Sequence, residues 1–269
     1  MGQDFLIEVA RPPVRPKPGQ TFPVVYVLDG NAAFALTAMA ARAVQSGPFP
    51  LPPTLVVGIG YHFERPEQRV QAGTLRTRDL TPCPDDLLES QYPGASARCG
   101  GATAFRAFIE EEVKPFVTSG FPVDPRDQTL VGSSLGGIFA LDTLFTTPAS
   151  FQRYIAISPA LYWGGRRLFA LEAALAARAD DLNAHLFLAA GALEEAHDAR
   201  QAFVSNLYAM EAQLRSRAYP SLDLALRVFD GETHMSVYPG AVTRGLGEVF
   251  GGYNDLSDWS RWLQRAAAT

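Results

Sequence analysis

Five residues near the middle of the chain, Gly132-Ser133-Ser134-Leu135-Gly136, have the spacing of a serine nucleophile. They stand between an apolar, strand-like run and a helix-like run. Such a turn has no room for side chains two residues either side of the serine, and it lifts the serine hydroxyl clear of the sheet. We therefore predict that Ser134 is a nucleophile and that the Leu135 N–H faces the developing oxyanion. The alternative is a glycine-rich turn in which Ser133 or Ser134 caps a helix.

A serine hydroxyl is a weak nucleophile at neutral pH, so it needs a general base. The chain has four histidines: His62, His185, His197 and His234. In α/β-hydrolases the nucleophile comes first along the chain, then the acid, then the histidine. His234 lies after a late strand-like run, Leu222–Phe229, in a polar turn. We predict that His234 is the base.

The base needs an acid to orient its ring, and three acidic residues follow the strand-like run that ends at Ala189-Ala190-Gly191. They are Glu194, Glu195 and Asp198. Glu194 is nearest to the end of the strand, and we predict it as the acid. Each of the three is equally suited to the first turn of a helix beginning near Asp198, where the helix dipole favours negative charge.

The remaining parts of a substrate site come from earlier and later loops. Asp29-Gly30-Asn31 ends a strand-like run, and the Asn31 N–H is expected to be the second oxyanion donor, although the same sequence also suits a plain turn. Arg78 would either grip an acidic or polyphenolate substrate or pair with a nearby aspartate such as Asp79. Tyr162 and Trp163 would either form an aromatic wall or belong to the core.

Alternating strand-like and helix-like runs are expected to carry these residues. The strand-like runs are Phe5–Val9, Pro23–Leu28, Thr54–Gly60, Gln128–Val131, Tyr154–Ile157, His185–Ala190 and Leu222–Phe229. The helix-like runs are Ala32–Val44, Thr103–Phe116, Gly137–Leu141, Arg166–Ala179, Asp198–Ser216 and Tyr238–Phe250. This order predicts an α/β fold with a mostly parallel sheet covered by helices on both faces. No shift in composition divides the chain, so we expect a single domain over residues 1–269.

A proline- and glycine-rich stretch, residues 61–101, is expected to be a long irregular excursion, and Pro122–Arg126 a turn. The excursion contains the two cysteines of the chain, Cys83 and Cys99. They are either unpaired thiols or a loop-closing disulfide. The disulfide would favour an oxidising compartment, and it gives a slight preference for a periplasmic over a cytoplasmic location.

Composition excludes several functional classes. The 269 residues are 47% hydrophobic and 19% charged, which favours a folded core over disorder. A net charge of −5 without a basic run argues against nucleic-acid binding and against binding to an anionic membrane. No run approaches the roughly 20 apolar residues of a membrane-spanning helix. The first nine residues lack the pattern of a signal peptide.

Several of these segments together resemble the "Putative esterase" family of α/β-hydrolases. The segments are Val24–Asn31, Thr77–Pro82, Val123–Pro125, Gly132–Gly137, Ser158–Trp163 and Glu232–His234. Within that family they are most similar to the siderophore esterases that cleave catecholate trilactones of the enterobactin type. The resemblance extends from about Phe5 to Phe250.

The resemblance implies a nucleophile at Ser134, a base at His234, oxyanion donors at Leu135 and Asn31, and an arginine, Arg78, that holds the catecholate or the reacting carbonyl. Some members work with a serine–histidine pair and no well-placed acid, which leaves the role of Glu194 open. This chain has Met235 after the histidine where the family usually has glycine.

We therefore expect a serine esterase that acts through an acyl-enzyme, with no metal or organic cofactor. Its partner would be a small ester, and any iron would arrive within a ferric siderophore substrate. The alternatives are an acyltransferase or general carboxylesterase on the same fold, and a catalytically inactive binding protein.

Overall fold

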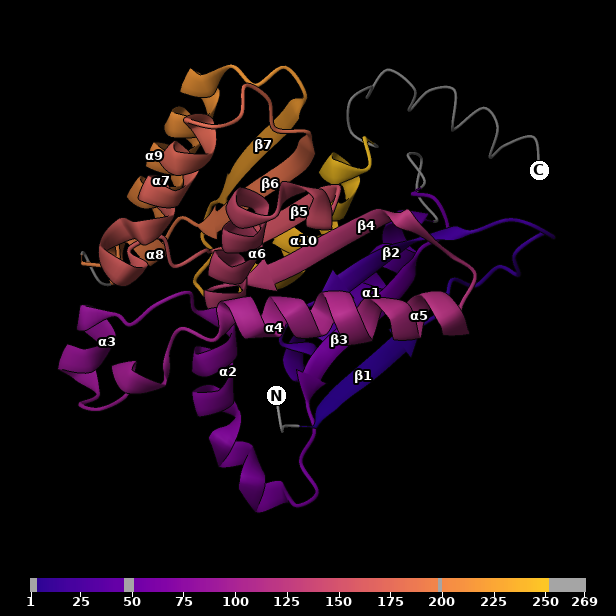
Figure 1. The fold of residues 1–269 in the computed structure, drawn as a ribbon, viewed down its shortest axis with the longest axis horizontal. Coiled ribbons are helices and arrows are strands. Elements are labelled where there is room, and N and C mark those ends of the chain that lie inside the picture. The colour runs from indigo at the N-terminus through magenta and orange to yellow at the C-terminus, as the bar shows by residue number, and fades with distance from the viewer. Residues whose placement is uncertain (1–3, 46–50, 198–199, 252–269) are drawn as a thin grey trace.

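A mixed seven-stranded sheet forms the centre of the structure (Figure 1). The structure is a computed structural model that describes residues 4–45, 51–197 and 200–251. In spatial order the strands are β1 (Phe5–Ala10), β3 (Leu55–Tyr61), β2 (Phe22–Val27), β4 (Val123–Ser133), β5 (Arg153–Ile157), β6 (Ala184–Gly191) and β7 (Leu222–Phe229). Among the strands of the described residues, only β1 and β3 pair in antiparallel fashion. The prediction of a mostly parallel sheet is confirmed.

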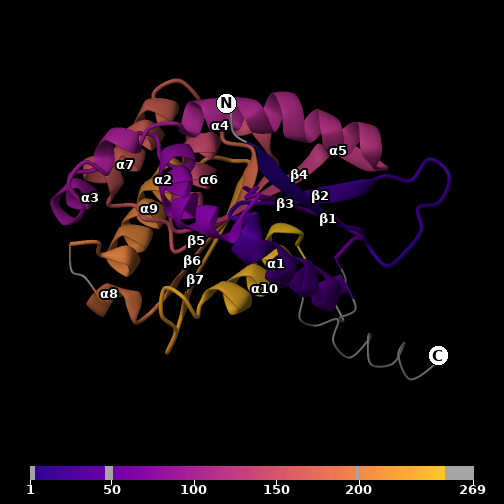
Figure 2. The same cartoon turned by 90° about the horizontal axis from the view of Figure 1, so that it is seen from below.

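Helices cover both faces of this sheet. They are α1 (Gly30–Gln45), α2 (Ala72–Leu80), α3 (Asp86–Gln91), α4 (Ala102–Phe108), α5 (Lys114–Gly120), α6 (Leu135–Thr146), α7 (Trp163–Ala176), α8 (Glu194–His197), α9 (Phe203–Arg217) and α10 (Tyr238–Val249). Figure 2 shows α1 and α10 on one face, with α4 and α5 on the other. No helix among the described residues is long and apolar enough to cross a membrane.

The two faces bury two separate hydrophobic clusters, which explains the continuous apolar runs of the central strands. Along β2, Val24 and Tyr26 point into the cluster under α4, α6, α7 and α9. Val25 and Val27 point into the cluster under α1 and α10. All four side chains are fully buried. Because successive side chains of a strand point to opposite faces, a strand covered on both sides must be apolar throughout.

The expectation of an irregular excursion over residues 61–101 is wrong. This stretch contains a 3-10 helix (Pro66–Gln71), α2, α3 and a short 3-10 turn (Ser96–Arg98). These helices are short and polar, so they show little apolar periodicity in the sequence. Contacts with α4 and α6 hold α2 in place, with Leu80 buried at its end.

Two element boundaries also differ from expectation. The predicted turn Pro122–Arg126 forms the first part of β4. The helix predicted over Thr103–Phe116 is longer and divided, with π-helical bonding over Ile109–Val113 between α4 and α5. Pro115 has no N–H to donate to residue 111, which accounts for the irregularity just before it. The single-domain organisation stays a prediction.

Candidate active site

Ser134 occupies the sharp turn between β4 and α6. Its backbone has φ 58° and ψ −114°, a conformation that non-glycine residues rarely adopt. A Cβ added to Gly132 would lie only 2.1 Å from the Gly136 carbonyl oxygen, so the first glycine of the motif is required by space. The Ser134 N–H donates to the Ile157 carbonyl at 2.9 Å, which ties the turn to β5. The strand–turn–helix context predicted for the motif is confirmed.

His234 and Glu194 meet in a short hydrogen bond. His234 Nδ1 and Glu194 Oε2 are 2.6 Å apart, and the glutamate is buried while the histidine is partly exposed. Glu194 lies three residues after the end of β6, at the start of α8, and His234 lies in the turn between β7 and α10. With Nδ1 engaged by the carboxylate, the other ring nitrogen is left for a reacting group.

Glu194 is fixed by more than the histidine. Its other oxygen, Oε1, accepts from Ser158 Oγ at 2.6 Å and from the Gly191 N–H at 2.7 Å. Burial raises the pKa of Glu194, but the hydrogen bonds from His234, Ser158 and Gly191 outweigh it and hold the pKa below its usual range. The structure therefore presents Glu194 as an ionised, fully satisfied carboxylate.

The alternative acids do not reach the histidine. Glu195 Oε2 accepts from the N–H groups of Val204 and Ser205 at 2.9 and 3.0 Å, so this carboxylate serves the start of α9. Asp198 lies outside the described residues. Of the other histidines, His185 is the second residue of β6, within the strand predicted there, and its Nδ1 lies 3.1 Å from Asp223 Oδ2.

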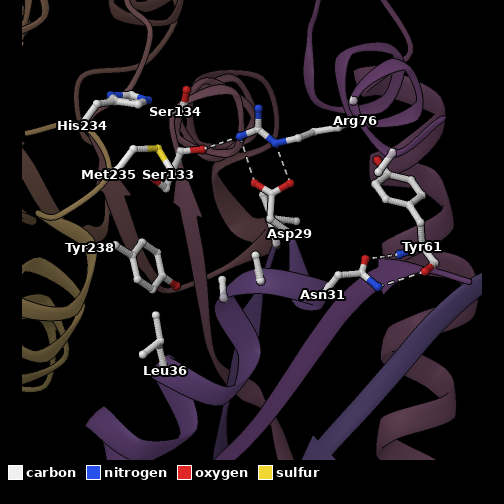
Figure 3. A pocket seen from close by; sticks show the side chains of 15 residues that line it. Asp29, Asn31, Leu36, Tyr61, Arg76, Ser133, Ser134, His234, Met235 and Tyr238 are labelled. Carbon is white, nitrogen blue, oxygen red and sulfur yellow. Dashed lines mark hydrogen bonds and ion pairs between the residues drawn. The ribbon is translucent and has the colours of Figure 1, made fainter. Parts of the chain in front are cut away.

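Ser134 and His234 line a common opening at the carboxyl ends of the strands (Figure 3). Two cavities of about 540 and 510 Å³ meet there, and both are lined by Ser134, His234 and Met235. In Figure 3 the nitrogen end of the His234 ring points toward the Ser134 hydroxyl. The ring of Phe203 packs on the histidine, with centroids 4.8 Å apart. Sequence reasoning missed Phe203, because it appears there only as one apolar residue of a predicted helix.

The two predicted oxyanion donors begin two different helices. Leu135 is the first residue of α6 and Asn31 the second residue of α1, so their N–H groups have no acceptor within the helix. The Asn31 side chain is itself clasped to β3. Its Oδ1 accepts from the Tyr61 N–H at 2.7 Å, and its Nδ2 donates to the Tyr61 carbonyl at 3.0 Å. Asn31 and Ser134 both line the larger cavity. The two hydrogen bonds from the Asn31 side chain to Tyr61 hold the start of α1 against the end of β3.

The arginine at the cavity is Arg76, not Arg78. Arg76 donates to both carboxylate oxygens of Asp29 at 2.7 and 3.0 Å and to the Ser133 carbonyl at 3.0 Å. Arg76 lines the larger cavity, and Figure 3 shows a further guanidinium nitrogen that no dashed line joins to the residues drawn. Arg78 instead pairs with the buried Asp79 at 2.7 Å and does not line either cavity. Two residues apart on a helix point roughly 200° apart, so reading this segment as a loop concealed which arginine faces the serine.

The two predicted aromatic residues separate in the same way. Tyr162 lines the smaller cavity and stands edge-on to Phe203, with ring centroids 5.7 Å apart. Trp163 is buried, and its Nε1 donates to the Cys83 carbonyl at 2.8 Å. The aromatic wall is therefore formed by Tyr162 and Phe203, and Trp163 belongs to the core.

Cys83 and Cys99 are both free, partly buried thiols. Burial raises the pKa of each, which favours the uncharged and less reactive form. The loop-closing disulfide is not formed in this structure, so the preference for a periplasmic location loses its basis.

A buried acid, a histidine and an elbow serine, on a mostly parallel sheet covered by helices, define an α/β-hydrolase of the serine type. The chain belongs to the family described as "Putative esterase", whose profile matches residues 1–238. It is 33% identical over 242 residues to the ferri-bacillibactin esterase BesA of Bacillus subtilis, covering 87% of this chain and 81% of that protein.

Two further comparisons extend the similarity to fungal proteins. The chain is 37% identical over 157 residues to a siderophore enterobactin esterase of Emericella nidulans, a match that covers 56% of this chain and 50% of that one. Its structure matches the siderophore hydrolase EstA of Aspergillus nidulans with a TM-score of 0.80 and 27% identity. That match covers 92% of this chain and 90% of the other.

Proposed function

We propose that this protein hydrolyses the ester bonds of a catecholate trilactone siderophore, with Ser134, His234 and Glu194 as its catalytic triad. The observation that carries the proposal is the Glu194–His234 hydrogen bond of 2.6 Å at an opening shared with the elbow serine. The similarity to esterases of bacillibactin and enterobactin supports the substrate class.

In the first half of the proposed reaction, Ser134 Oγ attacks the ester carbonyl while His234 takes the hydroxyl proton through Nε2. The negative charge that develops on the carbonyl oxygen is met by the N–H groups of Leu135 and Asn31. The positive charge on the imidazole is stabilised by the ionised Glu194. His234 then gives its proton to the departing alcohol oxygen, which leaves an acyl-enzyme at Ser134.

In the second half, water replaces the alcohol. His234 removes a proton from the attacking water, the acyl–serine bond breaks, and the proton returns to Ser134 Oγ. A free carboxylic acid and the regenerated hydroxyl are the products. A trilactone treated in this way opens first to a linear trimer and then to shorter pieces.

Arg76 lines the larger cavity together with Ser134, and its guanidinium would contact the anionic catecholate or the reacting carbonyl. We therefore propose for Arg76 the role that the sequence suggested for Arg78. Its bonds to Asp29 and Ser133 hold the guanidinium in one orientation, so little freedom is lost when substrate binds.

The test compares Ser134→Ala with its neighbour Ser133→Ala. Ser134→Ala should lower the rate of trilactone hydrolysis by about 10³-fold or more, because the triad acts as a unit. Ser133→Ala keeps the carbonyl that Arg76 binds and should stay within roughly tenfold of wild type. Mass spectrometry of apo and ferric trilactones after incubation measures both. Equal rates for the Ser134→Ala variant and wild type, or a wild-type protein that hydrolyses p-nitrophenyl acetate but no trilactone, would overturn the proposal.

A further inference from the structure

A buried hydrogen bond connects helix α1 to the segment that carries His234. Thr37 Oγ1 and the Tyr238 hydroxyl lie 2.8 Å apart. Thr37 lies on α1, the helix whose second residue is Asn31, and Tyr238 is the first residue of α10, which follows His234 closely along the chain. The bond therefore joins the helix that begins with a proposed oxyanion donor to the segment that carries the proposed base.

The surroundings of Thr37 fix the direction of this hydrogen bond. Thr37 is fully buried, and its hydroxyl donates its one proton to the Ala33 carbonyl at 2.9 Å. Its oxygen therefore accepts the proton of the Tyr238 hydroxyl. Burial raises the pKa of Tyr238 far above its usual value, so this hydroxyl stays protonated and remains a donor at neutral pH.

The turn around His234 and the start of α10 form one hydrogen-bonded unit. The Val237 N–H donates to the Thr233 carbonyl at 3.1 Å, and the Thr233 N–H donates to Ser236 Oγ at 3.0 Å. Because these bonds span His234, they leave the turn little internal freedom. A displacement of Tyr238 is therefore passed on to His234.

Helix α1 is a firm support for this unit, because it packs closely against β3. A Cβ added to Gly30 would lie 2.9 Å from the Ile59 backbone nitrogen, and a Cβ added to Gly58 would lie 2.8 Å from Phe34 Cβ. Both distances are too short for a real Cβ, so glycine lets the helix approach the strand. The Asn31 side chain adds two hydrogen bonds to the end of β3.

Tyr238 lines the larger cavity, but its polar atom does not face the reacting groups. Figure 3 shows the Tyr238 hydroxyl turned away from Ser134 and His234. The hydroxyl is engaged by Thr37 instead. A role for this hydroxyl in the reaction must therefore be exerted through the position of other groups.

We infer that Tyr238 is a positioning residue, whose hydrogen bond to Thr37 holds the His234 turn against α1 and so sets the base relative to the oxyanion donor at Asn31. The inference rests on the proposed reaction at Ser134 and His234. It adds to that reaction a residue that acts through His234 and leaves the choice of substrate unchanged.

The test compares Tyr238→Phe with Tyr154→Phe, since each change removes one hydroxyl from a buried ring. The Tyr154 hydroxyl donates to the Pro148 carbonyl at 3.4 Å and accepts from the Phe151 N–H at 3.3 Å. Tyr154 lies near the start of β5, whereas Ser134 follows the carboxyl end of β4, so Tyr154→Phe is a matched control distant from the site.

We expect Tyr238→Phe to lower kcat for p-nitrophenyl acetate by about 3–10-fold, the order of one hydrogen bond, with KM changed by less than about twofold. Tyr154→Phe should keep kcat within about twofold of wild type, even where urea denaturation shows that it is destabilised as much as Tyr238→Phe. Unequal effects on kcat at equal stability are what a purely structural role of the hydroxyl does not produce.

Changes at Thr37 test the other partner of the bond. Thr37→Val removes the acceptor and should lower kcat as Tyr238→Phe does, whereas Thr37→Ser keeps a hydroxyl and should lose less. The double variant Thr37→Val/Tyr238→Phe should have a kcat within about twofold of the lower of the two single variants, because both changes remove the same hydrogen bond.

Three results would overturn the inference. They are equal losses of kcat in the two tyrosine variants, a change in Tyr238→Phe that falls on KM alone, and a double variant whose loss is the product of the single losses. The expected pattern would support it. Because p-nitrophenyl acetate reports on Ser134 and His234 alone, a failure to hydrolyse trilactones would overturn the proposed substrate and leave this test unaffected.

Discussion

Two carboxylates stand at the carboxyl ends of strands on either side of Ser134, and they are held in different ways. Asp29, after β2, receives two hydrogen bonds from Arg76 and lines the larger cavity. Glu194, after β6, receives hydrogen bonds from Ser158, Gly191 and His234 and is 2% exposed. One carboxylate orients a guanidinium, and the other orients an imidazole.

The comparison shows how burial changes the effect of a hydrogen-bonded carboxylate. The Arg76 and Asp29 side chains keep 28% and 19% of their surface exposed, so water partly screens this pair and its main effect is on where the guanidinium points. A buried carboxylate that accepts from three donors is sensitive to substitution, because each donor left without an acceptor lowers the stability of the folded protein. We therefore expect changes at Glu194 to affect the rate more than changes at Arg76.

The largest effect after loss of the nucleophile is expected for Glu194→Gln. An amide offers one acceptor oxygen where Glu194 offers two, and its NH₂ group would face a donor, so the imidazole loses its orientation and its negative partner. By analogy with removal of a triad acid, kcat should fall by about 10²–10⁴-fold.

Glu195→Gln is the control for that change, because its carboxylate serves α9. It should alter kcat by less than about threefold, as surface changes usually do. Steady-state kinetics with p-nitrophenyl acetate measure both variants. If Glu194→Gln is as mild as Glu195→Gln, the protein works as a serine–histidine pair and the comparison drawn above fails.

The second prediction separates the two arginines by exchanging each for lysine. A lysine ammonium cannot reproduce the planar fork that holds Asp29 and the Ser133 carbonyl together. Arg76→Lys should raise KM for a catecholate trilactone by about tenfold, the order of one charge-assisted bond, and should affect p-nitrophenyl acetate less.

Arg78→Lys keeps a positive charge beside the buried Asp79, and its effect should be on stability rather than on KM. Urea denaturation and trilactone kinetics on both variants check this. A larger rise of KM in Arg78→Lys than in Arg76→Lys would restore Arg78 as the substrate residue.

The third prediction concerns the hydroxyl that supports the acid. Ser158 is fully buried and has φ +44°, so Ser158→Ala keeps that strain while Ser158→Gly relieves it. Both variants remove one bond to Glu194 Oε1, and kcat should fall by roughly 3–10-fold in each, corresponding to about 1 kcal/mol. Equal kcat values in the two variants would assign the loss to the hydroxyl, and a loss confined to Ser158→Gly would assign it to the change in backbone freedom.

The sheet, the sharp turn at Ser134 and the Glu194–His234 contact were predictable because strong local signals mark them. A continuous apolar run such as Pro23–Leu28 predicts a strand that is buried on both faces. The glycines on either side of Ser134 predict a sharp turn between a strand and a helix. The order of nucleophile, acid and base then pointed to His234, and proximity to the strand end selected Glu194.

The parts that were missed depend on packing between distant segments. Arg76 could not be told from Arg78 until α2 was known to be a helix, because its polar residues show no periodicity. Ser158 contacts Glu194 and Phe203 contacts His234 only because the fold brings the ends of β5 and β6 and the start of α9 together. No sequence pattern within either segment predicts these contacts.

The smallest effect expected is the pH dependence of stability that the hydrogen bond between Ser158 and Glu194 contributes. The pKa of Glu194 in the folded protein lies below the ordinary value of 4.5, so ionised Glu194 stabilises the fold above that pH. The contribution is lost as the pH falls through the lowered folded value, because the unfolded chain takes up the proton first. Ser158 acts on the ionised form, so the stability gap between wild type and Ser158→Ala should be constant near neutral pH and narrow on acidification below about 4.5.

Urea denaturation of both proteins at a series of pH values from 7 to about 3.5 measures that gap. Ser133→Ala serves as the reference, since Ser133 makes no hydrogen bond to Glu194 in the described part of the chain and its gap should not change with pH. A gap that widens on acidification would mean that Ser158 stabilises the protonated acid instead. Glu194 would then not be the permanently ionised partner that His234 requires, and the distinction between the two carboxylates would rest on burial alone.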